Sequence, residues 1–231
     1  MWIDRGPIVL AGAPRRHGER ADVTRPARPT LLALGVDGSE AAGTAGLTRL
    51  RHAEEEARDV VALWPSEGAT LRTGPAARWS SLRPAELATS DVIHVASHAL
   101  VYQGAAGRTT LLLAGEGEAP LTSAEIGRLR LRAALVFLSC CQAAEAERRG
   151  AGPAHAGLAR SFLAAGAATV VAPATRIDDA AARQFSRRLY EHWLAGSDAP
   201  QALRRAQLDL RRGDPRWAHP GYWAGYQAIG R

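Results

Sequence analysis

Val92-Ile93-His94-Val95-Ala96 and Ala133-Ala134-Leu135-Val136-Phe137-Leu138 are two short stretches in which almost every residue is apolar. A run of this length, bounded by polar residues, is typical of a strand that is buried on both faces. Strands of that kind occur in parallel sheets, where helices cover both sides. The two stretches therefore predict two strands of a parallel sheet in an α/β fold.

The same pattern extends outward along the chain. Helical spacing of apolar residues predicts helices over residues 50–64, 122–129, 158–165, 178–195 and 198–212. Further strands are expected at Leu31–Leu34, Leu111–Leu113 and Ala168–Ala172. Strands that alternate with helices predict a three-layer α/β/α sandwich with a mostly parallel central sheet. Residues 1–30 are rich in Pro and Arg and are expected to be an N-terminal extension or the edge of the domain, with one strand-like run at Ile8–Leu10.

The composition of the 231 residues favours a folded protein in a reducing compartment. About 46% of the residues are apolar, which is enough for a packed core. Cys140 and Cys141 are adjacent and cannot form a disulfide framework, so we expect a cytoplasmic location. No apolar stretch is long enough to span a bilayer, and the N-terminus does not resemble a signal peptide, so no membrane association is expected.

The formal net charge of +6 raises the alternative of a nucleic-acid binder. All 29 basic residues are Arg, which is the residue usage of a GC-rich, bacterial genome, and they are interleaved with acidic residues. High affinity for nucleic acid needs clustered phosphate contacts, so we do not expect nucleic acid as a partner. The sequence contains neither C-x-x-C nor H-E-x-x-H spacing, so no metal and no cofactor is expected.

Residues whose side chains can take part in catalysis follow the two central strands, at Ser97-His98 and at Ser139-Cys140-Cys141. Chemistry in parallel sheets gathers beyond the carboxyl ends of the strands. An imidazole and a thiol that meet there can form a catalytic dyad, in which the histidine takes the proton of the thiol. The backbone N–H groups of Cys141 and Ala99 are candidate donors to an oxyanion. One of the two adjacent cysteines must point into the core, and their spacing does not say which.

Several of these motifs resemble the CHAT domain, a caspase-like peptidase domain related to separase. Val92–Leu100 is similar to the histidine strand of that family, and Leu135–Gln142 is similar to its cysteine strand. In the family the cysteine directly precedes a polar residue such as Gln, which selects Cys141 over Cys140. Other matching segments are Leu121–Ile126, Gly157–Ala167, Val170–Asp179 and His219–Gly230. The resemblance makes residues 31–231 a CHAT-like domain with a caspase-like fold.

The resemblance implies a cysteine endopeptidase that cleaves a specific protein or peptide with His98 and Cys141 as its dyad. It also implies cleavage after Arg or Lys, held by an acid in the turn that contains Asp179, with Asp178 as the alternative. A carboxylate on the floor of a pocket can pair with a guanidinium through two hydrogen bonds. Either aspartate can instead cap the helix that begins there. Family members commonly adjoin helical repeats, so a regulatory partner or a missing repeat domain is expected.

Two positions depart from the pattern of the family. Ala174-Thr175 stands where the family has Leu-Trp, and Ala143-Ala144 stands where it commonly has Thr-Gly. These changes leave open an alternative, a catalytically inactive interaction module with the same fold. Of the other histidines, His94 in mid-strand is expected to be structural and His155 to lie in an exposed loop.

Overall fold

The computed structural model describes residues 9–11, 26–38, 48–65, 67–82, 84–102, 108–114, 121–142 and 154–230. Their strands form one sheet in the order β1-β9-β8-β7-β4-β2-β3, and β5 and β6 extend it beside β4. The strands are β1 Val9–Ala11, β2 Leu31–Gly35, β3 Ala69–Thr73, β4 Val92–Tyr102, β5 Arg108–Leu111, β6 Leu121–Thr122, β7 Leu135–Gln142, β8 Thr169–Pro173 and β9 Tyr226–Gly230.

The sheet is mostly parallel, as predicted. β4 lies between β2 and β7 and runs parallel to both, and β7 also runs parallel to β8. The antiparallel pairs lie toward the margins, where β9 joins β8 and the β5–β6 branch joins the end of β4. The edge strand β1 comes from the expected N-terminal extension and pairs with β9.

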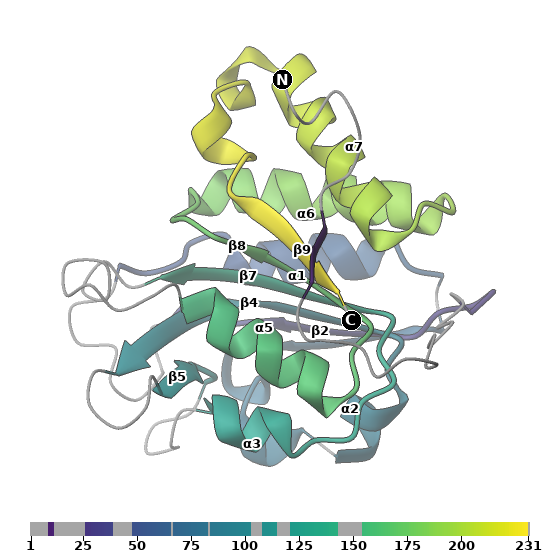
Figure 1. Cartoon of the computed structure of the whole chain (residues 1–231), viewed down its shortest axis with the longest axis vertical. Coiled ribbons are helices and arrows are strands. Elements are labelled where there is room, and N and C mark those ends of the chain that lie inside the picture. Colours follow the sequence, from purple (N-terminus) through teal and green to yellow (C-terminus); the bar gives the residue numbers. More distant parts are fainter. Residues whose placement is uncertain are drawn as a thin grey trace.

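Helices cover both faces of the sheet (Figure 1). The longer helices α6 and α7 lie on one side together with α1, and α5 lies on the other side with the short helices α2 and α3. The helices are α1 Ala53–Ala62, α2 Pro84–Thr89, α3 Ser123–Gly127, α5 Ala154–Ala165, α6 Asp179–Leu194 and α7 Ala199–Arg212. This arrangement confirms the three-layer α/β/α sandwich.

The strand β7 shows why continuous apolar runs predict this fold. Leu135 and Phe137 pack into the core under α1, α6 and α7, whereas Val136 and Leu138 pack into the core on the α5 side. Successive side chains of a strand point to opposite faces, so a strand between two helical layers needs apolar residues at every position. All four side chains are at most 1% exposed.

The ends of the helices follow the local signals in the sequence. Thr122 and Glu125 form the expected capping box at the start of α3, with each side chain bonded to the backbone of the other residue. Asp198 accepts a hydrogen bond from the backbone of Gln201 and caps α7. Gly166 ends α5 with φ +126°, a conformation that L side chains rarely adopt.

The strand boundaries differ from the predictions in one way that matters for function. β4 continues to Tyr102 and β7 to Gln142, so His98 and Cys141 lie within their strands and not after them. Pairing with β2 ends at Ala96, and β4 then continues by pairing with β5. Ladder hydrogen bonds come from the backbone, so polar side chains do not end a strand that still has a neighbour.

Three further strands, β3, β9 and the two-residue β6, were not anticipated. β3 is an edge strand whose five residues are all half-buried, so its sequence contains no continuous apolar run. β9 follows the aromatic stretch near the C-terminus and pairs antiparallel with β8. The expected strand at Leu111–Leu113 is shifted toward the N-terminus in β5.

We predict that Gly166→Ala lowers the free energy of unfolding by more than ~1 kcal/mol, because φ is positive and a Cβ would overlap the carbonyl oxygen of Leu131. Chemical denaturation measures this change. The matched control is Gly127→Ala at the end of α3, where a Cβ meets nothing within 4 Å. That substitution is expected to leave the protein equally stable or stabilise it by about 0.4–1 kcal/mol. Equal effects of the two changes would contradict the prediction.

Candidate active site

The two strands that carry His98 and Cys141 are direct neighbours. β4 and β7 pair in parallel from Val92↔Leu135 to Ala99↔Gln142, and in this register His98 pairs with Cys141. The structure therefore brings these two positions opposite each other, near the carboxyl end of β7. The sequence alone placed them only at the ends of two separate strands.

The ring of His98 is held by a backbone carbonyl and is buried, with 4% of the residue exposed. Nε2 lies 3.0 Å from the carbonyl oxygen of Thr48, and a carbonyl can only accept, so Nε2 carries the hydrogen. Nδ1 of the neutral ring is then an acceptor, and among the described residues no group bonds to it. Gly38 lies against the same ring, since a Cβ at that position would come within 2.9 Å of Cδ2.

Burial lowers the pKa of His98, because charging an imidazole away from water is unfavourable. The hydrogen bond to Thr48 and the negative charge of Asp179 act in the opposite direction, and Arg176 adds to the lowering. The ring is therefore neutral at pH 7, with a free lone pair on Nδ1. A group in this state can accept a proton from a thiol.

The adjacent cysteines occupy different environments. Cys140 is 6% exposed and belongs to the apolar core on the α5 side, with Sγ 3.8 Å from the carbonyl oxygen of Val95. It is the cysteine that points into the core, a choice that spacing left open. The side chain of Cys141 lies outside the described part of the structure, and its backbone lies in β7. Alternation along the strand assigns position 141 to the face of Phe137, opposite to that of Cys140.

The two predicted substrate-binding aspartates both bond to backbone groups at helix ends. Asp178 is exposed and caps α6 by accepting a hydrogen bond from the backbone of Ala181 at 3.0 Å. Asp179 is half-buried and accepts from the backbone N–H of His52, 2.8 Å away, at the start of α1. Burial raises the pKa of Asp179, and the hydrogen bond from His52 partly offsets this. Of the two, Asp179 is the one that interacts electrostatically with His98.

Ala99, the second candidate oxyanion donor, lies inside the sheet. Its Cα pairs with Gln142 on one side and with Leu111 on the other, and the residue is 2% exposed. His155, which was expected in a loop, lies in the first turn of α5. Ala143-Ala144, one of the two departures from the family pattern, lies outside the described residues.

A buried polar cluster lies below the candidate dyad, and the sequence analysis did not find its central residue. Glu56 on α1 is 1% exposed, and its Oε2 accepts a hydrogen bond from Ser139 Oγ at 3.1 Å. Its Oε1 lies 3.5 Å from Nε2 of His94, which is fully buried. The signal was available, because Glu56 falls at helical spacing from the inward residues Ala53 and Val60.

His94 is structural, as predicted, in the sense that it packs within the core. Its ring stacks on Phe137 with centroids 5.4 Å apart, and its Nδ1 lies 3.2 Å from the hydroxyl of Tyr190. Burial lowers the pKa of His94 to about 3 and raises the pKa of Glu56 to about 8. Both side chains are therefore neutral at pH 7, so their contact is not a salt bridge.

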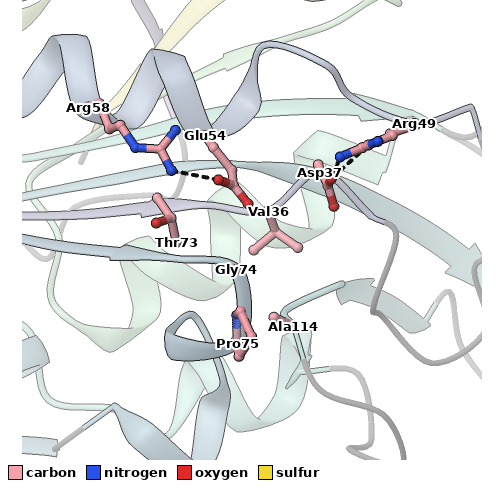
Figure 2. Close-up of a pocket in the computed structure, with 9 residues that line it drawn as sticks. All are labelled: Val36, Asp37, Arg49, Glu54, Arg58, Thr73, Gly74, Pro75 and Ala114. Carbon is pink, nitrogen blue, oxygen red and sulfur yellow. Dashed lines mark hydrogen bonds and ion pairs between the residues drawn. The ribbon is translucent and has the colours of Figure 1, made fainter.

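A polar pocket of about 370 Å³ is lined in part by Asp37 and Arg49, the neighbours in sequence of Gly38 and Thr48, which contact the His98 ring (Figure 2). Two ion pairs frame it, Asp37 with Arg49 and Glu54 with Arg58, each at 2.7 Å. Asp37 directly precedes Gly38, the residue in contact with the His98 ring. Since each of these carboxylates is paired with a guanidinium of the same chain, the four groups add no net charge to the pocket.

A family model described as the CHAT domain matches residues 5–231, nearly the whole chain. The chain belongs to the CHAT domain family. Tetratricopeptide repeat protein 28 of Mus musculus is 36% identical to this CHAT domain over 110 residues, and its Homo sapiens counterpart is 33% identical over the same length. The match covers 48% of this chain but only 4% of either relative.

Solved structures similar to this CHAT domain include caspase-like cysteine proteinases. The Arg-specific cysteine proteinase gingipain R matches 99% of this chain and 49% of its own with a TM-score of 0.51 and 8% identity. The complex of the pro- and mature domains of RgpB from Porphyromonas gingivalis matches 99% and 50% with a TM-score of 0.52 and 9% identity. At such identity the likeness concerns the fold, and it confirms the caspase-like architecture.

Two further properties concern the described residues only. No helix among them is both long and apolar enough to cross a bilayer. They also contain no group of three or more His, Cys, Asp or Glu side chains that could hold a metal ion.

We predict that the CHAT domain becomes less stable as the pH rises from 6.5 to above 8, and that Glu56→Gln removes this loss. The pKa of Glu56 is raised from 4.5 to about 8, so between these values the folded state holds a proton that the unfolded state has released. Stability therefore falls through this window. His94, whose pKa is lowered from 6.5 to about 3, has the opposite effect only below pH 6.5.

Urea denaturation of the wild type and the variant at pH 6.5 and above pH 8 measures this difference. Glu55→Gln is the control, because Glu55 is an exposed neighbour on the same helix and its pKa is lowered. This control should keep the wild-type loss. A loss of the same size in Glu56→Gln would show that the buried carboxyl stays in one charge state throughout.

Proposed function

We propose that this CHAT domain is a cysteine endopeptidase in which His98 and Cys141 form the catalytic dyad. The observation that carries the proposal is the β4–β7 register, which pairs the two positions on adjacent parallel strands. The tautomer of His98 supports it, because Nδ1 is left as an unprotonated acceptor. The family membership and the caspase-like fold agree with this chemistry.

The proposed reaction runs through an acyl-enzyme. Nδ1 of His98 takes the proton of the Cys141 thiol, and the thiolate attacks the carbonyl carbon of the scissile peptide bond. The backbone N–H groups of Cys141 and Ala99 are the proposed donors to the oxyanion. The imidazolium then gives its proton to the departing amine, and a water molecule, deprotonated by the same nitrogen, hydrolyses the thioester. The carbonyl of Thr48 keeps the ring in one orientation throughout.

The proposed substrate is a protein or peptide with Arg or Lys before the cleaved bond. Asp179 is the favoured partner of the basic side chain, because it is half-buried and interacts electrostatically with His98. A partly desolvated carboxylate binds a guanidinium more strongly than an exposed one does. Asp178 is the alternative. Gingipain R, which shares the fold, is an Arg-specific cysteine proteinase, and this supports a basic residue at this position.

Control by a partner is part of the proposal. His98 is 4% exposed and its ring contacts Gly38 and Thr48, so a substrate reaches the ring only when these contacts open, which an irreversible probe can trap in the isolated domain. A tetratricopeptide-repeat region, as in the names of the relatives, or a separate regulatory protein is the proposed cause of that opening. Loop movements of this kind are common in gated enzymes.

A catalytically inactive interaction module is the second candidate function. The burial of His98 favours it, and so does the exposed Thr175 at a position where the family has Trp. The two candidates differ in whether Cys141 becomes acylated.

We predict that an acyloxymethyl ketone with a basic residue next to its reactive group labels the wild-type protein at Cys141. Labelling should fall to background in Cys141→Ala, which lacks the nucleophile, and strongly in His98→Ala, which lacks the base. Cys140→Ala is the matched control and should be labelled like the wild type, because Cys140 lies in the core. Intact-mass spectrometry reads the result. Equal labelling of wild type and Cys141→Ala ends the dyad assignment.

The assignment of the specificity pocket predicts a difference between two neighbouring variants. Asp179→Asn should reduce the preference for a basic over a neutral probe by about tenfold or more, since it removes the charge that pairs with the guanidinium. Asp178→Asn should leave the preference unchanged and weaken only the cap of α6. Labelling rates with Arg-containing and Leu-containing probes measure both. The reverse result would assign the pocket to Asp178.

A further inference from the structure

One carboxyl group contacts both of the strands that carry the proposed dyad. His94 lies four residues before His98 on β4, and Ser139 lies two residues before Cys141 on β7. Strand residues at even spacing share a face, so these deeper side chains lie on the face to which positions 98 and 141 belong. Glu56 reaches both of them from α1, with Ser139 Oγ 3.1 Å from Oε2 and His94 Nε2 3.5 Å from Oε1.

The hydrogen positions in this cluster follow from the donors and acceptors present. Ser139 donates to Oε2, so the acid proton of a neutral Glu56 lies on Oε1, the atom that faces His94. Nδ1 of His94 lies 3.2 Å from the hydroxyl of Tyr190, so Nε2 is the nitrogen that faces Oε1; at 3.5 Å these two atoms are in polar contact but not hydrogen-bonded. A charged Glu56–His94 pair would place two ions in the core, and a single 3.5 Å contact between them does not offset their desolvation.

The other polar groups that face Glu56 come from α6. Tyr190 and Ser186 are fully buried beside it, and Asp179 and Arg183 act on its charge from the first turns of the helix. Arg183 is already bonded to Asp59 and Glu55, and Asp179 to the backbone of His52. A neutral Glu56 therefore places no buried charge below the dyad.

We propose that Glu56 is a positioning residue, which as a neutral acid joins the strand of His98 to the strand of Cys141 and so holds the two reacting groups together. The proposal rests on the dyad proposed above. The proposal also predicts different effects for Gln and Leu at position 56. A Gln side chain can accept from Ser139 and place its NH2 group against Nε2 of His94, whereas a Leu side chain can do neither.

The experiment measures the alkylation rate of Cys141 by iodoacetamide as a function of pH. It needs neither a substrate nor turnover, and Cys140→Ala is present in every protein so that a single thiol reacts. We expect Glu56→Leu to react about three- to tenfold more slowly at pH 7, the effect of one lost hydrogen bond, with its pH profile moved toward that of His98→Ala. Glu56→Gln should keep the wild-type profile below pH 8, the value about which Glu56 itself ionises.

Gln207→Leu separates positioning from general destabilisation. Gln207 is 9% exposed on α7 and donates to the carbonyls of Trp223 and Tyr226, so its loss also removes buried hydrogen bonds, but at β9, which pairs with neither β4 nor β7. Its alkylation profile should match the wild type. If both Leu variants slow alkylation equally, or if Glu56→Gln behaves like Glu56→Leu, the proposal is overturned.

Ser139→Ala and His98→Ala distinguish a failure of the Glu56 proposal from a folding defect and from a failure of the dyad. If Glu56→Leu does not fold, Ser139→Ala removes the contact on the β7 side alone, and an unchanged profile in that variant overturns the proposal. If His98→Ala leaves the wild-type profile unchanged, the dyad itself fails and the proposed peptidase with it. A changed profile in His98→Ala together with an unchanged one in Glu56→Leu removes only the role of Glu56.

Discussion

The parallel register between β4 and β7 is the constraint on which the rest of the structure depends. It pairs His98 with Cys141 and also decides which residues of β7 face each helical layer. A slip of one residue would turn Phe137 toward α5 and Leu138 toward α6, because neighbouring strand residues face opposite ways. The packing of two hydrophobic cores therefore fixes the same register that brings the candidate dyad together.

The side of the sheet under α1 and α6 has an unusual core. His94, Phe137 and Tyr190 pack as a group of rings, and Glu56 ends beside them. In this low-dielectric environment the acid and the imidazole both remain neutral. A cluster of this kind costs stability compared with an apolar core unless each polar atom is bonded. The proposed positioning role of Glu56 beneath the candidate dyad would explain that cost.

The contact that orients His98 also limits access to it. The carbonyl of Thr48 fixes the hydrogen on Nε2, and the same residue, together with Gly38, leaves 4% of His98 exposed. The contacts that orient the ring of this candidate base and those that bury it thus come from the same two residues. Under the proposed control by a partner, movement of Gly38 and Thr48 would open the ring.

The sequence by itself determined the α/β/α layers of this protein. Apolar runs and helical periodicity depend only on whether a strand or helix is buried on one face or on two. Capping motifs such as Thr122–Glu125 were readable for the same reason, since both partners lie within one turn. Only the tertiary structure decided that Cys140 belongs to the core and that Glu56, one of three consecutive glutamates, is buried against side chains of β4 and β7. These features depend on contacts between residues far apart in the chain, such as Glu56 with Ser139, and no local pattern specifies which distant side chain will meet a buried group.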